Sequence, residues 1–396
     1  MSIHNEELVQ KAVVTTDRLA SSGKLNTKQS NKFIDLVVDE TILKDNARVI
    51  RFRNEQLDID KIGIGTRAAV PKEEAIDPGV RRTVTTSQVT LVPKTIMVPF
   101  EISDEFKEIN IEGDSVEDHI INMFAKKMGN DMELQYISGD TNGPAIIEND
   151  YIPGGSETQH VKDGFLAMGD GWQKFANGGN IVDAAGQNIG LGVFNAAVRA
   201  MPTKFRGKLS NLRWFMSPDL WQIYIEKLST RAGTLGDAAA GGVGHNPLGI
   251  PAVRVPIWPF QPRTVEHLQM ATGAAVSLLS TNVSNVVVHP SDLGSVATTP
   301  YIEDTDYTLD AAAGTIADLS GAIGDTDIVK VTYDSAPQLI LTNWNNFIVG
   351  IGRDIRIEKD RSIFKSVNQY ALTAKIAVEF EELTAMVKVR NIGTGV

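Results

Sequence analysis

The alternation of apolar and polar residues predicts a protruding β-hairpin in the first quarter of the chain. From residue 62 to residue 102, apolar positions are interleaved with Thr, Ser, Gln and Lys, at Val84, Val89, Leu91, Ile96 and Val98. This alternation is typical of strands. Prolines at positions 71, 78, 93 and 99 interrupt the stretch. Because proline cannot donate to a strand ladder, we expect edge strands or an exposed hairpin here, not the middle of a sheet. Unpaired hairpin edges favour association with another chain.

A long helix is predicted directly after this stretch, over residues 115–137. Asp114 or Ser115 can serve as the N-cap, and Glu117 or Asp118 then completes a capping box. Lys127 and Asp131 stand at i,i+4 spacing, where they can pair with each other or with a neighbouring copy. Apolar residues at steps of three and four indicate that one face packs on a sheet; they are Val116, Ile120, Met123, Phe124, Met128 and Leu134.

The remaining pattern is a mixture of short helices and strands. Residues 1–45 predict short helices on a loosely attached arm, one from Asn5 to Val13 and another after Thr27. Helices are expected near 191–200 and 218–228, and strands near 211–216 and 250–257. The last segment predicts a strand pair whose alternation changes phase at Glu381-Glu382, which indicates a turn or bulge there.

The stretch from Thr264 to Gln338 differs from the rest in pattern and charge. Short β segments separated by Asp- and Gly-rich turns predict a small all-β module inserted into the mixed fold; we expect them at 286–289, 307–309, 314–316 and 328–333. The stretch holds ten acidic residues and one basic residue, so it carries most of the net charge of −11. Residues 61–100 are basic, with six Lys or Arg against three acidic residues. This asymmetry suits copies that meet through complementary patches, or two separately solvated faces.

Composition narrows the possible chemistry. The 396 residues predict two or three compact units, at roughly 100–200 residues each. The absence of cysteine excludes disulfides, thiolate metal sites and cysteine nucleophiles. No apolar run is long enough to span a bilayer, and the first residues lack the features of a secretion signal, so we expect a soluble protein made in a cytoplasm. The acidic balance argues against a dedicated nucleic-acid reader.

No catalytic or metal-binding motif is evident. The Gly-rich loop at 238–249 lacks the Lys and Ser/Thr of a phosphate-binding loop, and a mobile surface loop is the better interpretation. The six histidines show no metal-ligand spacing. An acidic cluster lacks the turn glycine and final bidentate Glu of a calcium loop, so we interpret it as solvated turn carboxylates; it comprises Glu303, Asp304, Asp306 and Asp310. We therefore expect no enzymatic activity, no cofactor and no metal.

The order of segments resembles the major capsid proteins of tailed bacteriophages, which have the Hong Kong 97-like fold. The resemblance is carried by LNTKQSNKFIDLVVDETIL (25–43), TVTTSQVTLVPKTIMVPFEISDEF (83–106), SVEDHIINMFAKKMGNDMELQYISGDTNG (115–143) and NNFIVGIGRDIRIEKDRSIFKSVNQYALTAKIAVEFEELTAMVKVRNI (345–392). Together these stretches cover about a third of the chain. The fold that the resemblance implies is α+β, and the resemblance also implies a set of domain boundaries. They are an N-terminal arm at 1–45; a peripheral domain with a spine helix at 46–61 and 100–144; an extended loop at 62–99; an axial domain at 145–262, returning at 339–349; an all-β insertion at 263–338; and C-terminal strands of the peripheral domain at 350–396.

The resemblance also implies a function and partners. Such proteins assemble as hexamers and pentamers into an icosahedral shell that encloses double-stranded DNA, and they work with a portal protein. Scaffolding and decoration proteins are further candidate partners, and the expected location is the virion capsid, assembled in the host cytoplasm. Some relatives form a Lys to Asn crosslink, for which Lys61 or Lys72 and Asn343, Asn345 or Asn346 are candidates. The inter-subunit contacts predicted from charge are Arg67, Lys72, Arg81, Arg82, Lys94, Lys127 and Asp131.

Three other classes of protein remain open from the sequence. An encapsulin-type nanocompartment shares the fold and encloses an enzyme cargo. An enzyme of unknown class could use the Gly-rich loop and the scattered carboxylates. A tail tube or sheath protein also assembles from copies, but a long helix does not suit a tube built mainly of strands.

Overall fold

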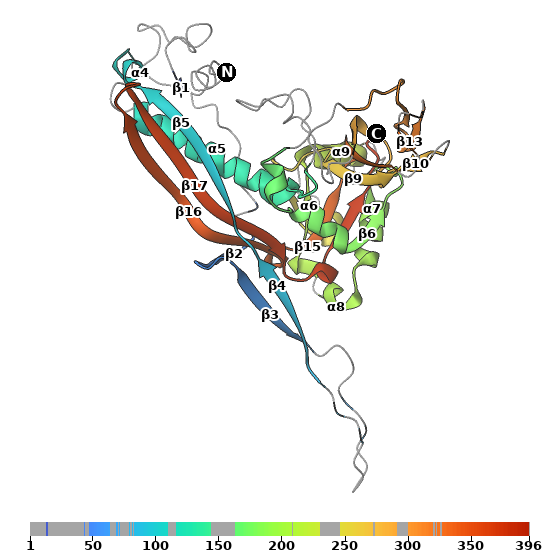
Figure 1. The fold of residues 1–396 in the computed structure, drawn as a ribbon. Coiled ribbons are helices and arrows are strands. Elements are labelled where there is room, and N and C mark those ends of the chain that lie inside the picture. The colour runs from blue at the N-terminus through green and yellow to red at the C-terminus, as the bar shows by residue number, and fades with distance from the viewer. Residues whose placement is uncertain are drawn as a thin grey trace.

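The structure is a computed structural model of the 396-residue chain. It describes residues 13–14, 43, 47–63, 69, 71, 79, 81, 83–109, 116–143, 163–207, 209–229, 246–271, 274–290, 300–319, 321, 323–324 and 327–395. Figure 1 shows an elongated part with a long sheet and a long helix, a compact part beside it, and a narrow hairpin that points away from both. None of the described helices combines the length and apolar character that crossing a lipid bilayer requires.

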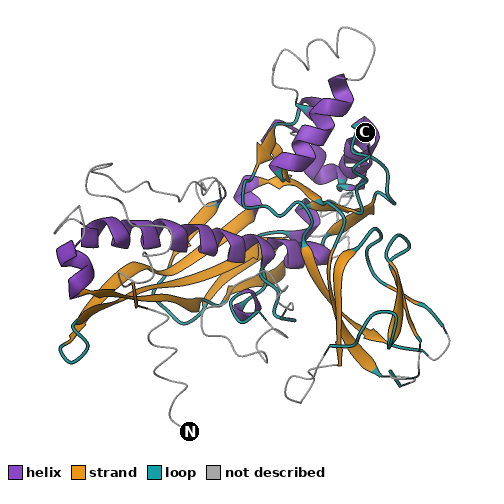
Figure 2. Cartoon of the chain, turned by 90° about the horizontal axis from the view of Figure 1, so that it is seen from above, coloured by secondary structure: helices purple, strands orange, loops and turns teal. Residues whose placement is uncertain are grey.

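The elongated part is a five-stranded sheet with the order β1-β5-β17-β16-β2. Its long strands are β5 (Lys94–Ser103), β16 (Phe347–Ser362) and β17 (Val367–Phe380), with β17 antiparallel to both neighbours. Two short parallel strands complete the edges, β1 (Val13–Val14) and β2 (Arg48–Arg51). The helices α4 (Asp104–Ile109) and α5 (Val116–Ser138) follow β5, and α5 lies along one face of the sheet (Figure 2). This confirms the long helix expected from the sequence.

Aromatic packing joins α5 to this sheet and to the compact part. Phe100 stacks on Phe124 of α5 and on Tyr370 of β17, with ring centroids 4.2 and 5.0 Å apart. Trp172 is fully buried and contacts Tyr136 and Phe347, at centroid distances of 6.0 and 4.4 Å. Burying an aromatic side chain stabilises the fold by about 1.5–3 kcal/mol relative to exposure. The two parts therefore share a continuous core.

The compact part is built on a second five-stranded sheet with the order β6-β18-β15-β7-β8. Its strands are β6 (Asn180–Asp183), β7 (Leu212–Met216), β8 (Ala252–Arg254), β15 (Leu339–Asn343) and β18 (Val387–Arg390). The helices around it are α6 (Trp172–Phe175), α7 (Leu191–Ala200), α8 (Thr203–Arg206) and α9 (Pro218–Ser229). Short 3-10 helices are η3 (Leu166–Met168), η4 (Ala176–Gly178), η5 (Leu209–Asn211), η6 (Pro247–Gly249), η7 (Trp344–Asn346) and η8 (Leu383–Ala385). The pattern-based elements near 191, 212 and 218 are confirmed.

The acidic stretch forms the all-β module that its pattern predicts. One three-stranded sheet contains β9 (Arg263–Gln269), β11 (Ser284–Pro290) and β14 (Ile328–Asp334), and the other contains β10 (Val276–Ser277), β12 (Tyr307–Asp310) and β13 (Thr315–Asp318). The module has its own hydrophobic core, which includes Tyr307, Ile316 and Val331. Its first strand pairs with its last, Arg263 opposite Asp334, so the chain enters and leaves at adjacent positions. We call residues 263–334 the insertion.

The extended hairpin has different limits from those expected. Strands β3 (Leu57–Gly63) and β4 (Thr85–Leu91) pair with each other and form the ribbon that points away from the body (Figure 1). Strand β5 belongs instead to the long sheet, so the expected extended loop at 62–99 is wrong at both ends. Pro99 lies opposite Ala371, and among the described residues only Val13–Val14, beyond Pro99, pair with the other side of β5. The proline is thus tolerated because β5 is an edge strand over most of its length.

Two other expectations need correction. The segments on either side of Glu381-Glu382 are not a strand pair, because β17 pairs with β16 and β5 whereas β18 pairs with β15 and β6. The change of phase marks the passage of the chain from one sheet to the other, so residues 387–390 do not belong to the peripheral sheet as expected. Val13 lies in strand β1 and not in a helix. The rest of the helix expected from Asn5, and the helix after Thr27, lie outside the described residues.

Candidate functional site

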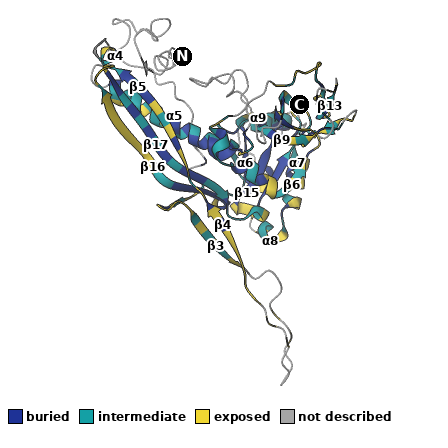
Figure 3. Ribbon diagram, in the orientation of Figure 1, coloured by how far each residue is buried: buried dark blue, intermediate teal, exposed yellow. Residues whose placement is uncertain are grey.

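The hairpin β3–β4 is anchored at its base and uncovered further out. Leu91 is fully buried and packs with Phe52, Ile348 and Ala377 in a small core of its own. Beyond this base, Ile62 and Val84 are 76% and 54% exposed, and residues 83–88 are exposed on both faces of the strand (Figure 3). A two-stranded ribbon with no covering layer is marginally stable in water. The outer hairpin therefore has apolar and backbone groups available to another molecule.

Ion pairs and hydrogen bonds fix the base of the hairpin to the turn after β17. Lys61 donates a hydrogen bond to the backbone oxygen of Glu381, and its Nζ lies 3.8 Å from the carboxylate of Glu382. Arg48 pairs with the Glu381 carboxylate at 2.9 Å. A hydrogen bond from the Thr384 hydroxyl, together with nearby Lys61, lowers the pKa of Glu382 despite the opposing effect of burial. These contacts set the direction in which the ribbon leaves the body.

The residues considered for a crosslink are held at this same turn. Asn346 is buried; its Nδ2 donates to the Glu382 carbonyl at 3.0 Å, and its Oδ1 accepts from the Glu382 amide at 2.8 Å. Asn343 caps η7 by accepting from the amide of Asn345. Lys72 lies outside the described residues. Within one chain, Lys61 thus links the hairpin base to the turn after β17, and Asn346 links η7 to the same turn.

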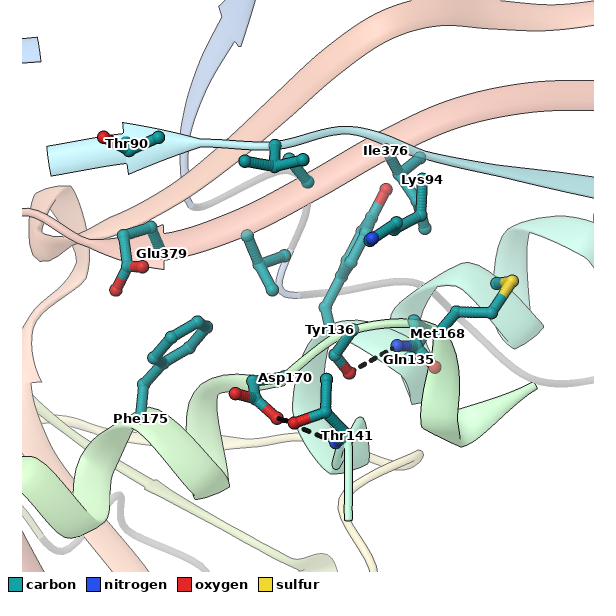
Figure 4. A pocket seen from close by; sticks show the side chains of 14 residues that line it. Thr90, Lys94, Gln135, Tyr136, Thr141, Met168, Asp170, Phe175, Ile376 and Glu379 are labelled. Carbon is teal, nitrogen blue, oxygen red and sulfur yellow. Dashed lines mark hydrogen bonds between the residues drawn. The ribbon is translucent and has the colours of Figure 1, made fainter. Parts of the chain in front are cut away.

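A pocket of about 220 Å³ lies where the hairpin base meets α5 and β17. Figure 4 shows Lys94, Asp170 and Glu379 at its wall, contributed by β5, by the segment before α6 and by β17. Thr141 donates to Asp170 from both its amide and its hydroxyl, at 2.8 and 2.7 Å. Burial raises the pKa of Glu379, and nearby Asp170 adds to the shift. The pocket is smaller than the roughly 300–1,000 Å³ usual for small-molecule sites, and its size suits one or two side chains of another chain.

The contact residues predicted from charge are not gathered in one place. Lys127 and Asp131 pair with each other along α5 at 3.1 Å, which is the first of the two roles expected for them. Lys94 is exposed at the pocket, and Arg81, which precedes β4 in the chain, is also exposed. Arg67, Lys72 and Arg82 lie outside the described residues. The structure therefore places four of the seven, two on α5 and two in the hairpin region, and leaves their intermolecular role as a prediction.

Sequence reasoning missed an apolar tip at the far end of the long sheet. Ile363 and Phe364, in the turn between β16 and β17, are 78% and 103% exposed. Ile355 and Ile357 on β16 are also exposed, and this part of β16 extends beyond its pairing with β2. The signal in the sequence is two adjacent apolar residues placed between Ser362 and Lys365 in a turn, where polar residues are the rule.

The acidic turns of the insertion have structural partners of their own. Asp306 accepts from the amide of Ile302 at 2.8 Å, and Asp310 accepts from the amide of Ala313 at 3.0 Å. Asp318 likewise accepts from the amide of Gly321. Within the part of the chain that the structure describes, no cluster of three His, Asp or Glu residues is arranged to hold a metal ion. These carboxylates cap turns.

The chain is similar over nearly its whole length to a known relative. The chain is 28% identical to the "Putative prophage capsid protein YqbE" of Bacillus subtilis (strain 168) over 393 residues, which covers 98% of this chain and 99% of the relative. Residues 261–345, which contain the insertion, match the family model described as "Protein of unknown function UCP028589".

Solved structures with a similar fold come from phage particles. A chain of Microbacterium phage Oxtober96 matches with a TM-score of 0.50 at 10% identity, over 95% of this chain and 99% of that chain. A chain from the asymmetric unit of the bacteriophage PhiM1 mature capsid matches with a TM-score of 0.49 at 10% identity, over 92% and 90% of the two chains. The chain therefore has the Hong Kong 97-like fold seen in phage particles, and it is similar over nearly its whole length to a putative prophage capsid protein.

Proposed function

We propose that copies of this chain assemble as hexamers and pentamers into the icosahedral shell of a tailed-phage particle that encloses double-stranded DNA. The observation that carries this proposal is the outer hairpin, which has exposed apolar residues and no covering layer among the described residues. A neighbouring copy supplies that layer in an assembled shell. Subunits held by many such modest contacts can correct errors during assembly and still resist internal pressure.

The distribution of charge supports a contact between the hairpin of one copy and acidic groups of an adjacent copy. Arg67, Lys72, Arg81 and Arg82 make the hairpin region basic, whereas the insertion is strongly acidic. We propose that the basic hairpin meets acidic groups of an adjacent copy, and that Lys94 takes part at the pocket beside the hairpin base. Lys127 and Asp131 are 59% and 34% exposed in their side chains, so each can exchange its partner in α5 for one on a neighbour. Such pairs tune specificity and association rate more than affinity.

The remaining partners follow from a shell that is filled with DNA. A portal protein is the expected entry point, scaffolding and decoration proteins are further partners, and assembly takes place in the host cytoplasm. The net charge of −11 suits a container that does not bind phosphates tightly, because phosphate neutralisation dominates nucleic-acid affinity. In this proposal the chain acts through assembly and has no catalytic activity.

The encapsulin alternative is less well supported than the phage shell, because the whole-length relative is a prophage capsid protein. Negative-stain electron microscopy of the purified protein tests the proposal. We expect closed shells, or hexamers and pentamers that close into shells when a scaffolding protein is added. Tubes, or monomers that stay monomeric under every assembly condition, would refute it. Shells that retain an enzyme cargo and no DNA would favour the encapsulin.

A further inference from the structure

A second, smaller cavity lies at the junction of α5, the compact sheet and the insertion. It has a volume of about 40 Å³ and is bordered by the end of α5 at Ser138–Asp140, by β18, and by Arg263–Thr264 and Leu279–Ser280 of the insertion. One water needs about 10–15 Å³ in this measure. The cavity therefore has room for two or three atoms or ions of that size, and it is distinct from the larger pocket beside the hairpin.

Unsatisfied polar atoms line this cavity. Gln173 is 7% exposed, and its Nε2 donor has no hydrogen-bond partner. Gln338 is 5% exposed; its Nε2 donates to the Ser335 hydroxyl at 2.8 Å, whereas its Oε1 acceptor has no partner. A buried polar group without a partner costs about 1–3 kcal/mol. Two such groups at one small cavity indicate an occupant that hydrogen-bonds to them.

Lys388 of β18 supplies a buried positive charge to the same cavity. It is 5% exposed, and its Nζ donates to the Gln173 carbonyl at 3.0 Å and to Asn177 Oδ1 at 2.8 Å. Both acceptors are neutral, and among the described residues no carboxylate lies within 4 Å of this ammonium. A buried charge normally has a counter-charge, because desolvation without one is expensive. An ammonium has three donors, so one remains for the cavity.

The other charged groups around the cavity already have partners. Lys174 pairs with Asp140 at 3.1 Å, Arg263 with Asp334 at 3.7 Å, and Arg390 with Asp183 at 3.3 Å. The carboxyl group of Glu266, on β9, accepts from the Tyr333 hydroxyl and the Leu279 amide, and burial raises its pKa. Lys388 is therefore the cation at this cavity that pairs with none of these carboxylates. Burial and the neighbouring Arg390 and Lys174, against an opposing effect of Asp140, lower the pKa of Lys388 to about 7.

We propose that this cavity is a binding site for one small monovalent anion, chloride under ordinary conditions, held between Lys388 Nζ and Gln173 Nε2. The two donors neutralise and bind the ion, and a water beside it donates to Gln338 Oε1. Since the cavity is walled by α5, the compact sheet and the insertion, the bound ion would join the insertion to the body of the capsid protein.

The test measures thermal unfolding of the full-length protein in sodium chloride and in sodium gluconate at equal ionic strength. We expect chloride to raise Tm with a saturating concentration dependence, by about 1–2 °C at a tenfold excess over the dissociation constant. The rise should be larger at pH 6 than at pH 9. The anion binds the protonated lysine, which the folded protein holds only below the lowered pKa of about 7.

Two variants separate this site from general salt effects. Lys388→Met should abolish the chloride dependence, because Met fills a similar volume without the charge, and Gln173→Leu should weaken it. Lys365→Met, at an exposed lysine in the turn between β16 and β17, should leave it unchanged. If Lys388→Met does not fold, crystals of the wild type soaked in bromide decide the question, with an anomalous peak expected beside Lys388 Nζ and Gln173 Nε2. No bromide peak there, or an equal chloride effect in Lys388→Met, would overturn the proposal and leave water as the occupant.

Discussion

The extended hairpin and the insertion both leave the body of the chain as β structure, but only the insertion is complete by itself. Ten buried apolar residues form a core inside the insertion, and two three-stranded sheets enclose it. The hairpin is a single two-stranded ribbon whose buried residues, such as Leu91, lie at its base. The insertion therefore has a hydrophobic core of its own, whereas the described part of the outer hairpin has none.

The two regions also differ in how they are attached to the body of the chain. The insertion is attached through adjacent strands, with Ser335 donating from its amide and its hydroxyl to the Pro262 carbonyl at 2.8 Å. The two ends of the insertion therefore lie next to each other where it joins the compact part. The hairpin continues from β5 and is fixed at Glu381-Glu382, so it transmits any contact that it makes to the long sheet.

The largest effect is expected from shortening the hairpin. Joining Lys61 to Ser87, which lie opposite each other, through an Asn-Gly turn removes the outer ribbon and keeps the base around Leu91. We expect the yield of shells to fall by more than tenfold while the Tm of the subunit changes by less than about 2 °C, because the base retains its core contacts. Sedimentation and negative-stain microscopy measure the first quantity, and calorimetry measures the second. Shells at the wild-type yield would contradict the proposed role.

Excision of the insertion should have a smaller effect on assembly. Joining Arg263 to Asp334 through a two-residue turn preserves their pairing and removes the separate core. We expect the remaining chain to fold and to form shells at a yield reduced by less than about tenfold, since the hairpin and the long sheet are unchanged. The excised segment should unfold cooperatively as a small domain, at the size for which marginal stability is usual. Circular dichroism of both products checks this, and an unfolded remainder would show that the insertion is not independent.

Reversing two charges on the hairpin should reduce the yield of shells less than the deletions do, and it tests the proposed contact with acidic groups of an adjacent copy. Arg81→Glu together with Arg82→Glu should lower the yield of shells severalfold at low salt and much less at high salt, because exposed charges are screened within about 10 Å at 0.1 M salt. Lys126→Glu, on the exposed side of α5, serves as a control with the same chemical change at one site. A yield that does not depend on salt in the double variant would exclude electrostatic docking of the hairpin.

The smallest predicted effect concerns the attachment of α5 to the long sheet, away from both the hairpin and the insertion. Burial alone would raise the pKa of Glu117, but hydrogen bonds from Lys107 and Lys359, with a further contribution from the Tyr370 hydroxyl nearby, overcome burial and lower it to about 2. The folded pKa lies below the ordinary value of 4.5, so this stabilisation is present above pH 4.5 and is lost as the pH falls toward 2. Glu117→Gln should lower the free energy of unfolding at pH 7 by about 1–2 kcal/mol. The difference from wild type should shrink below pH 4, as measured by urea unfolding.

Periodicity predicted the local elements well and their partners poorly. The apolar spacing of α5, α7 and α9 results from burial of one face of each helix, and this pattern is visible within a single segment. The pattern within a strand does not indicate which sheet the strand joins. β17 and β18 have similar alternation, yet they belong to different sheets. The hairpin boundaries were predicted wrongly for the same reason. Pro99 excludes a strand that is paired on both edges, but it permits an edge strand of the long sheet.

The candidate site was predictable in outline only. Alternation with interrupting prolines indicated a projecting hairpin, but its anchor at Glu381-Glu382 joins residues about 320 positions apart. No pattern within one segment reveals such a contact. Lys388 gave no signal either, because a lysine in an alternating strand ordinarily faces solvent, and its burial results from packing against α6 and η4.

Hydrogen exchange along β3 and β4, compared between unassembled subunits and assembled particles, tests the central claim most directly. The account predicts that the backbone amides of residues 83–88 exchange rapidly in free subunits and become strongly protected in particles, whereas the buried strand β14 of the insertion is protected equally in both. Equal exchange of residues 83–88 in the two states would contradict the claim that an adjacent copy covers the hairpin.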